Sequence, residues 1–149
     1  RPLVYALSCA PPILAAVIAA RAEASSARAT WGKRREGLTV HDALAVTVGQ
    51  RIPFKRALVR NLVKISLPWQ LGHTVAFGAA EGGFEKLDPV TIGAAAALYP
   101  LLGVMLWTAL RGDGRAVHDR VAATQVRGSA ARDQDAPHER RVPVETESA

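Results

Sequence analysis

The sequence predicts an all-α membrane protein with about three transmembrane helices and a basic cytoplasmic loop that contains a short hairpin and an amphipathic helix. Long stretches of the chain carry no charge, and most of the basic residues lie between them. A single cysteine, Cys9, excludes an intramolecular disulfide framework. The bulk averages hide this pattern, because 49% hydrophobic residues and a mean hydropathy of +0.08 are typical of a slightly basic soluble protein.

Three uncharged runs are the candidate spans. Residues 2–20 and 89–110 reach the roughly 20 residues that a helix needs to cross a hydrocarbon core of about 30 Å. The shorter run at 65–80 reaches this length as 62–80, with Lys64 extending its amine toward the headgroups. A buried helix of a soluble domain is the alternative for each run. That alternative is weakest for 89–110, which is apolar all round.

The first run has a second alternative, because residues 22–29 resemble an Ala-x-Ala cleavage site after a secretory signal. The mature protein would then begin near Ala29 and be a secreted soluble domain. The printed chain begins at Arg1, and its only methionine is Met105. We therefore expect a further N-terminal element upstream, such as a fourth membrane helix.

The charges of the loops predict an orientation. Residues 21–60 hold nine Lys or Arg and three acids, and residues 81–88 hold one Lys and three acids. Residues 111–149 hold seven Arg and seven acids. Because Lys and Arg favour the cytoplasm, 21–60 and the C-terminus are expected inside and 81–88 outside the plasma membrane. Anionic headgroups are the predicted partners of the 21–60 loop. Nucleic acid is not expected as a partner, because the apolar runs separate the basic residues that a binding surface would need together.

The loops carry weaker local patterns. Apolar residues that alternate loosely from Leu38 to Val48 predict a short strand, or a hairpin turning near His41–Asp42. After Pro53, apolar residues recur every three or four positions among basic ones, which predicts a basic amphipathic helix leading into the second span. Residues 1–127 form the predicted transmembrane domain. The polar segment 128–149, with two prolines, is predicted to be a disordered cytoplasmic tail.

Two blocks of residues resemble the RDD family of bacterial integral membrane proteins, over about residues 25–127. The matching positions, one block in the 21–60 loop and one after the third run, are Thr30, Gly32, Lys33, Arg34, Gly37, Arg56, Arg60, Asn61, His118, Asp119, Arg120 and Thr124. The resemblance implies an integral membrane protein and, for some members, cation/proton exchange. The family has a further Arg and Asp in its first membrane helix, whereas residues 1–20 contain Arg1 and no Asp. Either the chain is an N-terminally truncated member or this member has lost that helix.

Two titratable residues are candidates for proton or ion coupling. His73 lies within the second run, and Asp119 follows the third. Each has a structural alternative: His73 hydrogen-bonds between packed helices, for instance to Gln70, and Asp119 pairs with an arginine of the 21–60 loop.

The sequence lacks the motifs of common enzymes and metal sites. The four histidines are not spaced as metal ligands, and Walker, GxSxG and HExxH motifs are missing. We therefore expect no catalytic residues, metal or cofactor. The leading hypothesis is a multispan, non-enzymatic protein of transport or cation/proton exchange, with an anionic-lipid or partner-binding membrane scaffold as the alternative. Small residues at 93–97 and Gly103 allow either a homo-oligomer or packing against an upstream helix.

Overall fold

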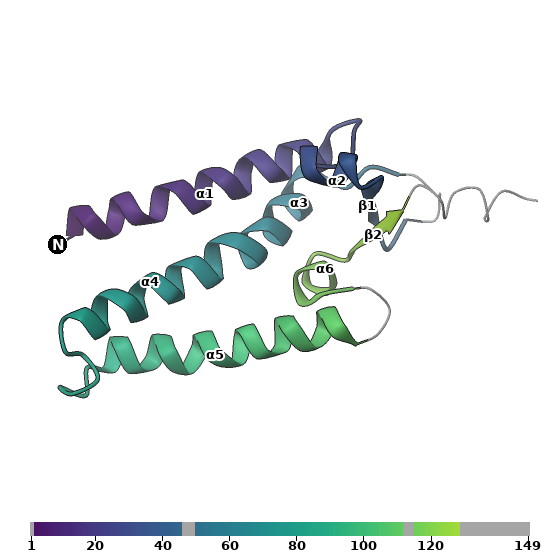
Figure 1. Cartoon of the computed structure of the whole chain (residues 1–149). Coiled ribbons are helices and arrows are strands. Elements are labelled where there is room, and N and C mark those ends of the chain that lie inside the picture. Colours follow the sequence, from purple (N-terminus) through teal and green to yellow (C-terminus); the bar gives the residue numbers. More distant parts are fainter. Residues whose placement is uncertain (1, 46–49, 112–114, 129–149) are drawn as a thin grey trace, which may run out of the picture.

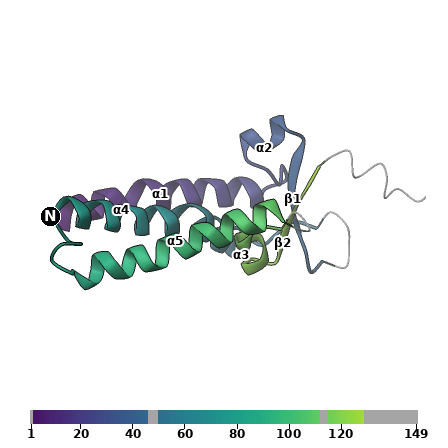
Figure 2. The ribbon, with the colours of Figure 1, turned by 60° about the horizontal axis from the view of Figure 1, so that its bottom comes forward.

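The computed structural model describes residues 2–45, 50–111 and 115–128, which are mainly helical. In chain order the elements are α1 (Pro2–Ala24), α2 (Trp31–Arg35), β1 (Leu38–Asp42), α3 (Phe54–Asn61), the π-helical segment η1 (Leu62–Ser66), α4 (Leu67–Ala80), α5 (Pro89–Leu110), α6 (Val117–Val121) and β2 (Thr124–Gly128). Three rods lie side by side: α1, the helical run α3–η1–α4, and α5 (Figures 1 and 2). The elements α2, α6, β1 and β2 gather at one end of the rods, and the turn between α4 and α5 lies at the other.

Two helices of the described chain are long and apolar enough to cross a membrane, namely α5 and the Leu7–Ala24 part of α1. The predicted helices at 2–20 and 89–110 are thus confirmed as helices. The predicted span 62–80 corresponds to η1 and α4 together, because α4 alone has 14 residues. Of the predicted tail, only Gly128 belongs to the described residues, as the end of β2, and 129–149 lie outside them.

The rods expose apolar side chains along much of their length. The exposed residues include Leu7, Leu14 and Ile18 of α1, Trp69 of α4, and Val104, Leu106 and Trp107 of α5. The buried apolar cluster is small and lies at the end with the short elements, formed by Ala20, Val40, Ile52 and Ala57. Large exposed apolar surfaces are typical of sites that contact lipid or another protein. The buried apolar cluster therefore lies at one end of the rods, whereas apolar side chains are exposed along their length.

The loop strand pairs with a distant partner. β1 runs antiparallel to β2, in register from Leu38 opposite Gly128 to Asp42 opposite Thr124. The predicted hairpin turning near His41–Asp42 is therefore wrong, and the fold is not wholly helical. Alternation of apolar residues detects a strand but does not specify its partner. The pairing ties the loop after α1 to the segment after α5.

The amphipathic helix is confirmed as a helix, but its buried face differs from the one predicted. α3 buries Ala57, Arg60 and Asn61, whereas Phe54 is 41% exposed. Arg60 is thus buried within the protein rather than exposed on the surface of the helix. Glu23 of α1 and Asp119 of α6 pair with Arg60 on this face. The buried charge therefore has counter-charges, which reduce the cost of removing it from water.

The turn between α4 and α5 is closed by a cap and a close backbone approach. Asp88 accepts hydrogen bonds from the Thr91 amide (2.8 Å) and hydroxyl (2.6 Å), which cap α5. These bonds hold the pKa of Asp88 below its ordinary value. A Cβ added at Gly78 of α4 would lie 2.0 Å from the Thr91 hydroxyl oxygen. Only glycine therefore lets α4 approach α5 this closely while Thr91 keeps its bond.

We predict that Gly78→Ala destabilises the α4–α5 pair, because the new methyl group must displace Thr91 from Asp88. A loss of about 1–3 kcal/mol is expected for such overpacking. Gly72→Ala is the matched control in the same helix, since a Cβ there meets no described atom within 4 Å. Thermal unfolding in detergent measures both variants. Equal melting temperatures for the two variants would contradict the close approach of α4 to α5.

Candidate functional site

Arg60 occupies the centre of a buried charged cluster at the end where the short elements gather. Its side chain is 1% exposed, and it lies on the buried face of α3. Nε donates to Oδ1 of Asp119 in α6 at 2.7 Å. Nη1 donates to both oxygens of Glu23 in α1, at 2.8 and 2.9 Å. One guanidinium thus joins three helices that are far apart in the sequence.

The two carboxylates have further partners. Glu23 pairs with Lys33 of α2 and accepts a 2.8 Å hydrogen bond from the side-chain amide of Asn61. Asp119 accepts from the Thr124 hydroxyl at 3.0 Å. The formal charges of the two acids and two cations cancel. Such balance matters, because an unpaired charge in a buried site costs several kcal/mol.

The surroundings lower the pKa values of Asp119 and Lys33. Burial alone would raise the pKa of Asp119, but the hydrogen bond and charge of Arg60 outweigh it and hold this pKa below its ordinary value. Burial and the charge of Arg60 lower the pKa of Lys33. The Asp119 carboxylate is therefore ionised near neutral pH.

His118 lies against the cluster as a neutral side chain. Nε2 is 3.5 Å from Oδ2 of Asp119, while Nδ1 is buried and lacks a hydrogen-bond partner among the described residues. Burial lowers the pKa of His118 to about 4, although the charge of Asp119 acts in the opposite direction. At neutral pH the imidazole adds no charge to the cluster.

A second arginine, one helical turn before Arg60, holds the end of α6. Arg56 pairs with Asp42 of β1 at 2.6 Å and donates to the Ala122 carbonyl oxygen at 2.8 Å. It also donates to the Ala123 carbonyl oxygen. A cation at these carbonyls satisfies acceptors that the helix end leaves unpaired. Arg56 and Arg60 together fasten α6 and the sheet to α3.

Seven of the twelve predicted motif residues lie in the charged cluster around Arg60 or in the contacts of Arg56. They are Lys33, Arg56, Arg60, Asn61, His118, Asp119 and Thr124. The prediction that Asp119 pairs with an arginine of the 21–60 loop is confirmed, and Arg60 is that arginine.

The other five motif residues lie outside the cluster. Thr30 begins α2 and accepts from the Arg34 amide at 3.0 Å, and Gly37 ends this turn with φ of 64°. Gly32 and Arg34 are exposed on α2. Arg120 is exposed, and its Nε donates to the Arg115 carbonyl oxygen. Thr30 and Gly37 therefore flank the α2 turn, whereas Gly32, Arg34 and Arg120 lie at the surface.

His73 is separate from Asp119. It bonds the Trp69 carbonyl oxygen within α4 at 3.2 Å, and its ring stacks on Trp69 with 4.7 Å between centroids. The predicted bond to Gln70 is wrong, because Gln70 instead accepts from the Cys9 thiol of α1 at 2.9 Å. The two coupling candidates therefore belong to different parts of the fold.

Glu23 is the member that the sequence patterns missed. It follows the uncharged run 2–20, and in the sequence it belongs to the charged loop 21–60. The signal for it is an acid one helical turn beyond an apolar helix, in a loop that holds nine Lys or Arg. Such an acid pairs with a cation when the helix continues through it, and α1 continues to Ala24.

Within the described residues, no group of three or more His, Cys, Asp or Glu side chains could hold a metal ion. Comparison with protein families, curated proteins and solved structures found no match to this chain. The resemblance to the RDD family thus stays a prediction.

We predict that Asp119→Asn lowers folded yield and stability by about 3 kcal/mol, because Arg60 loses a buried counter-charge. Glu36→Gln is the matched control, as an exposed carboxylate at the end of α2. The double variant Asp119→Asn, Arg60→Met should lose less free energy of unfolding than the sum of the losses in Asp119→Asn and Arg60→Met alone. Chemical unfolding of the parent, both single variants, the double variant and Glu36→Gln measures these losses, and additive losses would contradict the pairing.

The stability should also depend on pH through His118. Between pH 6.5 and about 4 the unfolded chain binds a proton at this residue while the folded chain does not. Folding stability therefore falls as the pH is lowered through that window, by up to about 1.4 kcal/mol per pH unit. His118→Gln removes the titration and should flatten the profile. An unchanged slope in His118→Gln would place the acid sensitivity elsewhere.

Proposed function

We propose that this chain is a non-enzymatic integral membrane protein of the RDD type, in which α1, the run η1–α4 and α5 cross the plasma membrane. The observation that carries the proposal is the segregation of burial, with apolar side chains facing outward along the rods and the charged cluster at one end. At about 1.5 Å per residue, the 22 residues of α5 match a hydrocarbon core of about 30 Å.

The distribution of charge supports a cytoplasmic location for the end with the short elements. The nine Lys and Arg of 21–60 belong to this end, whereas the three acids of 81–88 belong to the turn at the other. The positive-inside rule then places the 21–60 loop and the C-terminal segment in the cytoplasm.

Retention of α1 is favoured over a cleaved signal peptide. Cleavage near Ala29 would remove Ala20 from the small apolar core and Glu23 from Arg60. Arg60 would then keep one buried counter-charge. The packing therefore supports α1 as a permanent part of the domain rather than a leader of a secreted one.

Transport, in the form of cation/proton exchange, is the specific role that we propose. Its support is a pair of helix irregularities at the same level: Pro11 and Pro12 inside α1, and η1 in the neighbouring rod, joined by a 3.1 Å bond from the Ser66 hydroxyl to the Pro12 carbonyl oxygen. Interrupted helices that meet inside a membrane are typical of transporters, and π-helical turns occur often at functional sites.

An anionic-lipid-binding scaffold is the second candidate, favoured by two exposed tryptophans with cations over their rings. Arg35 lies 4.8 Å from the ring of Trp31, and Arg111 lies 3.8 Å from that of Trp107. Trp and Arg at a membrane interface contact headgroups. A homo-oligomer is compatible with either role.

We expect the full-length protein to stay in membranes after carbonate washing. Release into the wash would overturn the integral arrangement. In proteoliposomes, Na⁺- or K⁺-dependent proton flux should appear and should fall in His73→Ala and in correctly folded Asp119→Asn. Membrane retention without flux, combined with tighter binding to anionic than to neutral vesicles, would favour the scaffold.

A further inference from the structure

A line of polar side chains follows the middle rod, and its first three members bond α1 while the fourth lies one helical turn further on. It consists of Asn61, Ser66, Gln70 and Thr74, which we call the polar stripe. The spacing is four residues within α4 but five across η1. In a continuous α-helix, Ile65 would follow Asn61 on this face. The wider π turn instead brings Ser66 into line, so the irregular segment joins the stripe to the buried end of α3.

α1 lines the other side of the polar stripe. The Cys9 thiol donates to the Gln70 side chain, and the Gln70 amide donates to the Cys9 carbonyl oxygen at 3.5 Å. The hydroxyl of Ser8 is buried and has no partner among the described residues. Pro11 and Pro12 supply no backbone donor to the carbonyls one turn earlier. This side therefore presents a buried hydroxyl and two carbonyl oxygens to which Pro11 and Pro12 donate no bond.

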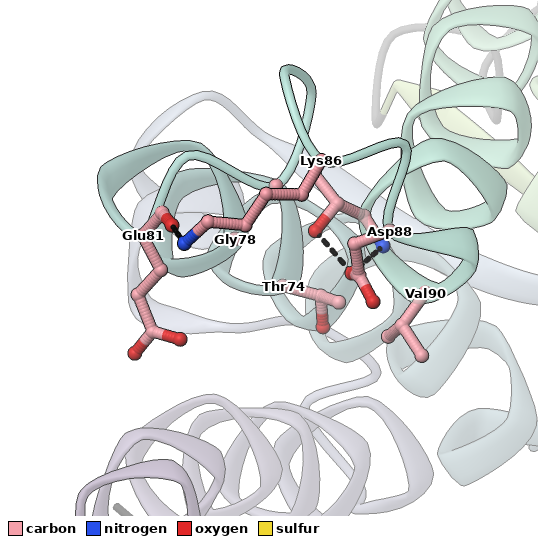
Figure 3. A pocket seen from close by; sticks show the side chains of 8 residues that line it. Thr74, Gly78, Glu81, Lys86, Asp88 and Val90 are labelled. Carbon is pink, nitrogen blue, oxygen red and sulfur yellow. Dashed lines mark hydrogen bonds between the residues drawn. The ribbon is translucent and has the colours of Figure 1, made fainter.

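The polar stripe reaches a pocket at the turn between α4 and α5. The pocket has a volume of about 220 Å³ and is lined by Thr74, Gly78, Glu81, Lys86, Asp88 and Thr91, among others. Figure 3 shows Lys86 reaching to the Glu81 carbonyl oxygen, with Asp88 beside Thr74. Since a water occupies about 30 Å³, the pocket has room for several. Thr74 belongs both to the pocket and to the stripe.

At its other end the polar stripe meets the charged cluster. The Asn61 amide donates to Glu23, the carboxylate that Arg60 and Lys33 also bind. Oxygen groups therefore follow one another from the pocket at the 81–88 turn to the cluster. In an apolar medium, only such a line of oxygens and water can replace the hydration of an ion.

We propose that the polar stripe is a hydrated path, open to small monovalent cations including the proton, from the pocket to the Glu23 carboxylate. The path rests on the proposed membrane function and specifies its route. Ser8, Cys9 and Gln70 form its narrow middle section, and Thr74 forms its entrance from the pocket.

Cys9 serves as a native reporter, because it is the sole cysteine. In sealed proteoliposomes, a membrane-impermeant cationic methanethiosulfonate added at the 81–88 side should modify it. Thr74→Leu should slow this modification about tenfold or more, as an apolar side chain closes the entrance. Val75→Leu is the matched control, one residue off the stripe, and should leave the rate unchanged. A Cys9 that reacts only after denaturation in SDS would overturn the path.

The same vesicles separate the path from the proposed function. Gln70→Leu should abolish proton, Na⁺ or K⁺ flux, whereas Thr108→Val in α5, off the stripe, should not. Flux that persists in Gln70→Leu and Thr74→Leu would overturn the path while leaving transport in place. Modification of Cys9 without flux of any of the three ions in the parent would support the hydrated stripe and overturn the exchange function.

Discussion

The buried guanidinium of Arg60 is the constraint on which the rest of the fold depends. A side chain that is 1% exposed cannot keep its charge without counter-charges, and both lie on other elements, Glu23 at the end of α1 and Asp119 in α6. Pairing Arg60 with both carboxylates fixes where α1 ends beside α3 and where α6 packs on α3. The β1–β2 pairing then follows, because β2 begins shortly after α6 ends and Arg56 holds the junction between them.

This constraint also explains why the apolar rods and the polar end coexist. The rods bury little of their own apolar surface, so packing between them contributes less than in a soluble bundle. The cluster instead supplies directional contacts among α1, α2, α3 and α6. A neutral sum of charges lets these contacts form in a buried site, and a neutral His118 preserves that sum at physiological pH.

Properties encoded by local composition were predictable, and properties encoded by pairing were not. The helices of α1 and α5 follow from uncharged runs of sufficient length, and Asp119 was expected to find an arginine because juxtamembrane charges pair. Which arginine it finds depends on the tertiary fold. The partner of β1 lies near the far end of the described chain, and Glu23 reads as an ordinary loop charge until α1 is seen to continue through it.

The π segment shows most clearly why hydrophobic periodicity was insufficient. From Phe54 to Ile65 the apolar residues recur with α-helical spacing, which predicts one apolar face continuing into α4. That face would leave Arg60 and Asn61 unpaired on the far side from Ser66 and Gln70. One wider turn at Leu62–Ser66 brings both polar sets toward α1. The backbone irregularity thus resolves a conflict between two patterns, one apolar and one polar, that a straight α-helix could not satisfy together.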